Sequence, residues 1–237
     1  VLPLDFDEFL LFKNKVVKKD EQYLLKTYAE DFLRLGGLPE YVLTEDASYI
    51  KNIVEQIITK DIILLNDIKD KGSVEKLFLL LCERVGKRIS YAKLARILEV
   101  SSDTVRRYVE YFKDTFLFFI VEKYSHSLNE KTFSPKKVYI ADIGIRNVFT
   151  GLRDTGTLLE NLTYLSLKTN EVYYYYESGK EIDFIVVQGK KKIAIEVKYK
   201  ERIEKNELDF FETSPFQKKI LITTVGDIQQ IRKAMDL

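Results

Sequence analysis

Cysteine, histidine and methionine are nearly absent from this sequence of 237 residues, which contains one of each. The single cysteine, Cys82, excludes a disulfide bond within the chain and fits a reducing cytosol, where we expect this protein. Cys82 lies in an apolar run, so we expect a buried thiol. The single histidine, His126, has no companion ligands in its loop, so we expect an exposed imidazole rather than a metal site.

Two longer patterns are also missing. No apolar run reaches the roughly 18 residues of a membrane span, and there is no signal peptide, so no membrane partner is expected. No phosphate-binding loop occurs, because none of the ten glycines precedes a Lys-Ser or Lys-Thr pair. The chain begins with Val1 and its only methionine is Met235, which indicates a fragment of a longer polypeptide.

What remains is the composition of a globular protein with balanced charge. Hydrophobic residues make up 46% of the chain and charged residues 32%, and the length suffices for two modest domains. The net charge is +1, so any nucleic-acid-binding surface has to be local.

The stretch 181–200 predicts a β-hairpin with a charged end. Apolar and β-branched residues fill both arms, and Gly189 and Lys190 form a two-residue turn between them. This turn places Gln188 opposite Lys191 and thereby sets the register of both strands.

In that register the charged residues meet at the open end of the hairpin. Asp183 lies opposite Glu196, and Glu181 lies opposite Lys198. Opposed carboxylates repel, so a shared Mg²⁺ would account for the first pair, with Lys198 beside an attacking water. The alternative is a solvent-facing sheet end in which Glu181 and Lys198 form an ion pair. One face of the hairpin is wholly apolar and suits burial: Ile182, Phe184, Val186, Ile193, Ile195 and Val197.

Asp183 followed by Glu196-Val197-Lys198 resembles the D…(D/E)xK signature of PD-(D/E)XK nuclease-like domains. The whole chain is similar to the C-terminal region of a family of archaeal and bacterial AAA-type ATPases, in which a winged helix precedes such a domain. The stretches that carry this resemblance are LPLDF from Leu2, GGLPEY from Gly36, YIADIG from Tyr139, LLEN from Leu158, EIDF from Glu181 and IEVKY from Ile195. The proline of the nuclease motif is absent before Asp183, which leaves activity open.

The resemblance implies a set of functional residues and partners. Asp183 and Glu196 would bind Mg²⁺, Glu160 would complete the metal site, and Lys198 would assist hydrolysis of a phosphodiester. ATP would bind only in an N-terminal ATPase domain that this fragment lacks, and that domain would be a partner within the parent chain. Whether the chain forms a homo-oligomer is left open.

Residues 87–137 predict a winged helix-turn-helix. Short helices over 91–98 and from 103 to about 113, capped by Ser90 and by Ser101 or Ser102, precede two strands over 117–124 and 136–140. This region carries eleven basic and six acidic residues. The predicted DNA contacts are Arg106, Arg107, Lys131, Lys136 and Lys137. Winged helices also serve as protein-docking modules, so a protein partner is the alternative.

Capping signals predict further helix starts. Asp20 begins a helix that ends at Gly36, and Ser73 begins another that runs to about residue 85. Asp142 follows a strand and is expected to be an N-cap. Thr157-x-x-Glu160 reads as a capping box, which competes with the metal-site role of this glutamate.

Together these patterns predict a mixed α/β protein with three parts. Residues 1–72 form a helical connector, 73–140 a winged helix, and 141–237 a restriction-endonuclease-like α/β domain. The expected function is a DNA-binding, nuclease-like part of an ATPase with Mg²⁺-dependent phosphodiester hydrolysis. The alternatives are a non-catalytic DNA-binding module and a module that binds only protein.

Overall fold

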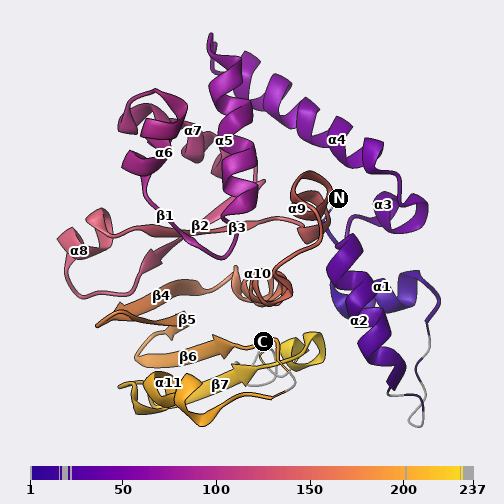
Figure 1. The fold of residues 1–237 in the computed structure, drawn as a ribbon, viewed down its shortest axis with the longest axis vertical. Helices are drawn as coiled ribbons and strands as arrows, with labels where there is room; N and C mark the ends of the chain where they lie inside the picture. Colours follow the sequence, from indigo (N-terminus) through magenta and orange to yellow (C-terminus); the bar gives the residue numbers. More distant parts are fainter. Residues whose placement is uncertain are drawn as a thin grey trace.

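The chain folds as a mixed α/β protein in which helices pack around one seven-stranded sheet (Figure 1). The computed structural model describes residues 2–15, 17, 21, 23–200, 202–229 and 231. The strand order is β1-β3-β2-β4-β5-β6-β7, with parallel pairing of β2 with β4 and of β6 with β7. The predicted mixed α/β class is confirmed. In the described ranges, no helix is long and apolar enough to cross a membrane.

Helices form the N-terminal part: α1 (Phe6–Phe12), α2 (Tyr23–Leu35), α3 (Pro39–Thr44), α4 (Ala47–Gln56), the π-helical continuation η2 (Ile57–Leu64) and α5 (Lys71–Glu83). Helix α2 ends before Gly36, whose φ of +73° favours glycine, as predicted. The predicted Ser73 cap is wrong, because Asp70 starts α5 earlier and accepts a hydrogen bond from Ser73 N at 3.1 Å. The predicted cap Asp20 lies outside the described residues.

The predicted helix-turn-helix is present. Helix α6 (Tyr91–Leu98) is capped by Ser90 and α7 (Ser102–Asp114) by Ser101, each through a side-chain oxygen. Three antiparallel strands adjoin these helices: β1 (Arg88–Ile89), β2 (Phe118–Lys123) and β3 (Lys136–Ile140), in the order β1-β3-β2. A short helix that the sequence did not predict, α8 (Leu128–Phe133), lies in the loop between β2 and β3.

The sheet continues beyond the predicted boundary at residue 140, since β2 pairs with β4 (Glu171–Glu177). The other C-terminal elements are α9 (Ile143–Thr150), α10 (Thr155–Leu167), β5 (Lys180–Gln188), β6 (Lys191–Val197), η3 (Lys205–Glu207), α11 (Asp209–Thr213), β7 (Lys218–Ile222) and η4 (Val225–Asp227). The division into three parts stays a prediction.

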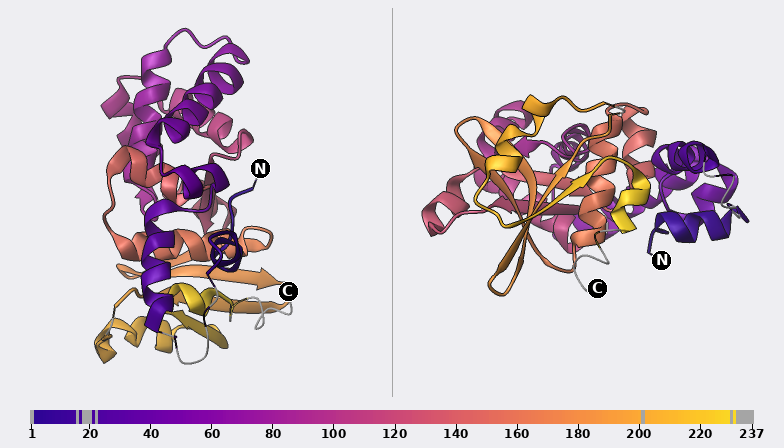
Figure 2. Two further views of the ribbon diagram at one scale, coloured as in Figure 1. Left: turned by 90° about the vertical axis from the view of Figure 1, so that its right-hand side faces the viewer. Right: turned by 90° about the horizontal axis from the view of Figure 1, so that it is seen from below.

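The C-terminal half of the sheet is covered on both faces. Apolar residues of α10 pack with one set of strand side chains, and Phe211 of α11 packs with the other set. The tyrosines of β4 follow this alternation: Tyr174 belongs to the α10 side, and Tyr173 and Tyr175 belong to the α11 side. Helices α1 and α2 lie to one side of the sheet, beside α10 (Figure 2).

A buried junction joins the N-terminal helices to α9. Asp142 caps α9 through Ile145 N, as predicted, and also accepts a hydrogen bond of 2.6 Å from Gly37 N. Leu4 N donates to Gly37 O at 2.7 Å. A Cβ at Gly144 would lie 2.0 Å from Leu35 O, so only glycine permits this approach. Three of the quoted stretches, at Leu2, Gly36 and Tyr139, therefore meet at one structural junction.

Candidate functional site around Lys137

The predicted hairpin register is confirmed. Strands β5 and β6 pair from Gln188↔Lys191 to Phe184↔Ile195, where the regular ladder ends. Beyond it, Asp183 and Glu196 are neighbours, as the register requires. The contact between them runs from Asp183 N to Glu196 Oε2, at 3.4 Å.

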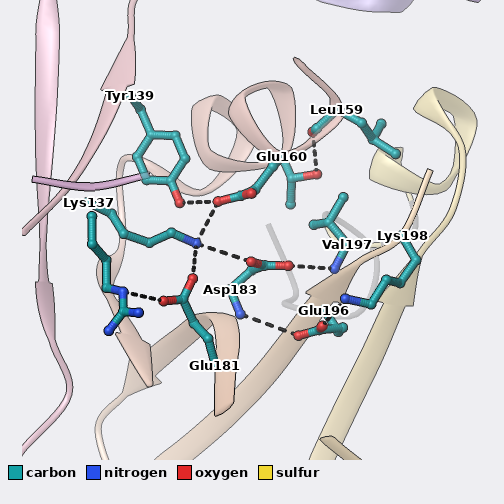
Figure 3. A network of polar contacts seen from close by, with 11 residues as sticks. Lys137, Tyr139, Leu159, Glu160, Glu181, Asp183, Glu196, Val197 and Lys198 are labelled. Atoms are coloured by element: carbon teal, nitrogen blue, oxygen red, sulfur yellow. Dashed lines mark hydrogen bonds and ion pairs between the residues drawn. The ribbon is translucent and has the colours of Figure 1, made fainter. Parts of the chain in front are cut away.

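A β-bulge turns the Asp183 side chain away from Glu196. Tyr173 of β4 pairs with Ile185 and Tyr175 pairs with Ile182, so Tyr174 alone faces the two residues between them. The Asp183 carboxylate accepts hydrogen bonds from Val197 N at 3.0 Å and from Lys137 Nζ at 3.1 Å. The two carboxylates therefore do not face one another across the strands (Figure 3).

Because of the same bulge, the apolar face predicted for the hairpin is only partly present. Phe184 and Val186 pack on the α10 side as expected, whereas Ile182 packs on the α11 side. The alternation shifts at the bulge because two residues of β5 oppose one residue of β4. This irregularity depends on β4, which is not part of the hairpin pattern.

Lys137 lies at the centre of the site. Its side chain is 1% exposed, and its ammonium contacts Glu160 and Glu181 at 2.7 Å each and Asp183 at 3.1 Å (Figure 3). In this structure the Lys137 ammonium is buried and engaged by three carboxylates, and the DNA contact expected of it stays a prediction. Lys137 is buried because its strand, β3, lies inside the sheet with β1 on one edge and β2 on the other.

Glu160 belongs to this cluster and not to a capping box. Helix α10 begins at Thr155 after Asp154, so Thr157 lies inside the helix and the predicted box is wrong. The Glu160 carboxylate accepts a hydrogen bond from Tyr139 Oη at 2.6 Å in addition to its ion pair with Lys137. Tyr139 was not predicted, although it shares a strand face with Lys137 by the period of two.

The outer charges of the site are paired differently from the prediction. Glu181 contacts Arg88 Nε at 3.0 Å, and the Arg88 guanidinium lies 3.7 Å from the centre of the Tyr176 ring. Lys198 contacts Glu196 Oε1 at 2.7 Å. The predicted Glu181 and Lys198 pair is therefore replaced by two separate ion pairs.

Burial and mutual repulsion dominate the electrostatics of the acids. Burial, and then the charge of Asp183, raise the pKa of Glu160 to about 7 and that of Glu196 to about 7. Burial by itself would lower the pKa of Lys137, but the surrounding negative charges outweigh it and raise this pKa well above its ordinary value. Lys137 is therefore a fixed positive charge at any pH near neutrality.

The donor set does not fit a resident magnesium ion in this arrangement. Mg²⁺ needs carboxylate oxygens directed at it. Both oxygens of Asp183 and both of Glu196 already accept from protein donors, and Glu160 is paired with Lys137. Within the described part of the chain, no group of three or more His, Cys, Asp or Glu side chains is arranged to hold a metal ion. The magnesium site with Asp183, Glu196 and Glu160 stays a prediction.

The remaining predicted DNA contacts differ in their access to solvent. Arg106 and Arg107 are exposed on α7. Lys131 is half-buried, with its ammonium 4.6 Å from the centre of the Tyr173 ring. Lys136 is buried and paired with Glu122 at 3.0 Å, so its ammonium is engaged inside the protein. Two of the five predicted contacts are thus fully available on the surface.

Known families match both halves of the chain. The family described as Domain of unknown function (DUF8612) matches residues 21–156, and Domain of unknown function (DUF4143) matches residues 155–237.

Three uncharacterized relatives illustrate the spread of similar proteins. One from Methanocaldococcus jannaschii is 31% identical over 220 residues, which cover 84% of this chain and 49% of that protein. One from Haemophilus influenzae is 26% identical, covering 94% and 58%, and a second from Methanocaldococcus jannaschii is 27% identical, covering 92% and 50%.

The chain spans about half the length of the curated relatives it matches. No solved structure matches it. Because the first of the two family matches covers more than half of its residues, the chain belongs to the family described as Domain of unknown function (DUF8612).

Proposed function

We propose that this chain is a non-catalytic, DNA-binding regulatory module of an AAA-type ATPase. The observation that carries the non-catalytic part is the buried Lys137 ammonium, which holds the carboxylates of Glu160, Glu181 and Asp183. These acids act as a structural ion-pair network that joins β3 to α10 and β5. In a nuclease of this type, the same acids would have to be directed at a metal ion and a water.

Exposed positive charge on a helix-turn-helix supports the DNA-binding part. Arg106 and Arg107 project from α7, the second helix of the motif, which is the helix that such motifs place in the major groove. The only acid in the first turn of α7 is Asp103, and Glu110 is neutralised by Lys113 at 2.6 Å. Helix α7 as a whole is neutral, because Asp103, Glu110 and Asp114 balance its three basic residues. Arg106 and Arg107 nevertheless place two adjacent positive charges at the surface, where a phosphate backbone can reach them.

Support for the ATPase partner comes from the resemblance and from length. The relatives are about twice as long as the matched region, which leaves room for a domain of another kind. In this proposal the ATPase domain of the parent chain binds ATP, and the present chain couples DNA binding to it.

A charge-reversal experiment tests DNA binding. The variant R106E/R107E is compared with K51E/K60E, which reverses two exposed charges on α4 and η2 and changes the net charge equally. Duplex binding is measured by fluorescence anisotropy between 50 and 200 mM salt. We expect R106E/R107E alone to weaken binding and to reduce the slope of log K against log salt by roughly 2. Equal binding by the two variants would reject α7 as the interface.

The rival function is a Mg²⁺-dependent nuclease. The observation in its favour is that Asp183, Glu196 and Lys198 do lie together at one sheet end. Calorimetric titration with Mg²⁺ and Mn²⁺, with Asp183→Ala as control, decides between the two. A heat of binding that Asp183→Ala removes, together with DNA cleavage that Glu196→Ala removes, would establish the nuclease and overturn the non-catalytic proposal.

A further inference from the structure

A second surface, away from Lys137, combines partly buried aromatic rings with lysines. It lines a pocket of about 800 Å³ between the end of β2, the loop before α8, the end of β4, β6 and the segment before β7. The side chains that matter are Tyr124, His126, Tyr175, Lys192 and Phe216. They lie on the α11 side of the sheet, whereas the Glu160 partner of Lys137 comes from α10.

The aromatic rings form a continuous wall. The Tyr124 ring meets Phe216 edge-on, with ring centres 5.9 Å apart, and Tyr175 meets Phe216 in the same manner at 5.2 Å. His126 extends the wall, with its ring centre 5.6 Å from that of Tyr124. Tyr124 and Tyr175 are only partly buried, whereas Phe216 is 5% exposed. Phe210 stacks on one face of the Tyr175 ring, with ring centres 6.0 Å apart, so a ligand could use only the other face of that ring.

Lysine charge accompanies this wall. Lys192 Nζ lies 5.2 Å from the centre of the Tyr124 ring. The two acids that line the pocket are already engaged: Glu130 with Lys123, and Glu177 as acceptor for Tyr175 Oη at 2.6 Å. The hydrogen bond from Tyr175 leaves the charge of Glu177 in place, so the two lysines and two acids that line the pocket balance. The positive charge beside the aromatic wall is that of Lys192.

More lysines continue from the pocket along the edge of the sheet. The β5–β6 turn supplies Lys190 and Lys191, next to Lys192. Strand β7 begins with Lys218 and Lys219, and Lys218 pairs in register with Ile193, the residue after Lys192. Neither of these two segments contains an acid. The result is a basic rim of five lysines at this end of the sheet. By strand alternation Lys192 and Lys219 lie on the α11 side with the aromatic wall, and Lys219 Nζ donates to Glu212 O at 2.8 Å.

We infer that this pocket and rim bind single-stranded nucleic acid, with a base against Tyr124 and Tyr175 and the backbone phosphates along Lys192 and the rim. Proteins that bind single strands without sequence preference combine aromatic rings with positive charge. Any base can stack on a ring, and each backbone phosphate carries a negative charge that a lysine can bind. A duplex keeps its bases stacked inside, so it cannot use the wall. This inference adds a second ligand and a second site to the proposed duplex-binding module.

Binding of a fluorescein-labelled oligothymidylate of about 15 nucleotides tests the inference. Tyr124→Leu removes the ring but keeps an apolar side chain, and we expect affinity to fall roughly five-fold or more, as for loss of one stacked base. Lys192→Gln removes one charge and should reduce the salt slope by about 0.7. Lys51→Gln, an exposed lysine on α4, is the matched control and should leave both unchanged.

The two sites are separated by crossing ligands and variants. R106E/R107E should lose duplex binding and keep the single strand, whereas Tyr124→Leu and Lys192→Gln should do the reverse. If R106E/R107E keeps full duplex binding while Tyr124→Leu and Lys192→Gln lose the single strand, the α7 proposal fails and this inference stands.

A mapping experiment does not depend on any substitution. Oligothymidylate carrying 5-iodouracil is cross-linked by light to the unmodified protein, and the adduct is located by mass spectrometry. Adducts on Tyr124, His126, Tyr175 or Phe216 support the inference. Adducts confined to α7, or wild-type affinity for the single strand in both pocket variants, overturn it.

Discussion

Replacing Lys137 by methionine should destabilise the protein strongly at neutral pH. Methionine retains an apolar stem of similar length, so the packing around a side chain that is 1% exposed is largely kept. The ammonium is lost, however, and three carboxylates that it contacts within 3.1 Å are left without their shared cation. Removing one partner of a buried ion pair costs about 3–5 kcal/mol, and we expect Lys137→Met to fall in this range.

Lys136→Met is the matched control. Lys136 is the neighbour on β3, and its ion pair is with Glu122, whose side chain is 48% exposed. Solvent reaches Glu122 and partly screens the pair, although the Lys136 side chain is 10% exposed, so its loss should cost less than that of Lys137 with its three buried partners. Urea unfolding of both variants, followed by circular dichroism at pH 7, provides the comparison.

Two further measurements on Lys137→Met probe the cause of the loss. At pH 5 the cost should shrink, because Glu160, whose pKa is already about 7, becomes protonated and the repulsion among the acids falls. Mg²⁺ should raise the melting temperature of Lys137→Met and leave that of the wild type unchanged, since only the variant exposes unpaired acids to a cation. Equal losses for Lys137→Met and Lys136→Met, or a cost independent of pH, would refute this account of the site.

The other predictions concern the buried acid Glu196 and the space around two glycines. Burial and Asp183 raise the pKa of Glu196 to about 7, above the value of about 4 in an unfolded chain. The folded state therefore favours the protonated acid, and the wild type should lose stability relative to Glu196→Gln as pH rises from 5 to 8; urea midpoints check this, and the opposite trend would contradict it. Gly144→Ala, whose Cβ would lie 2.0 Å from Leu35 O, should destabilise by about 2 kcal/mol or more in thermal melts. Gly156→Ala in α10, where the new Cβ meets nothing within 4 Å, should instead stabilise by about 0.5–1 kcal/mol, and similar effects of the two would reject the steric argument.

The sequence by itself determined the local features of this protein. The turn at Gly189 and Lys190 defined the register of β5 and β6, because a two-residue turn leaves one pairing of the strands that follow. Ser90, Ser101 and Asp142 marked helix starts correctly, because a cap is decided by atoms within three residues. Periodicity and turns of this kind also sufficed for the mixed α/β class.

The tertiary structure decided the contacts between distant segments. The bulge at Asp183 arises from pairing with β4, and no pattern within β5 and β6 contains that strand. Lys137 reads as a surface charge in the run around it, and only the placement of β3 between β1 and β2 buries it among acids from α10 and β5. Burial makes each unpaired charge costly, so the acids and the lysine that share this interior pair with one another. That requirement of the folded interior, rather than any spacing along the chain, decided the site.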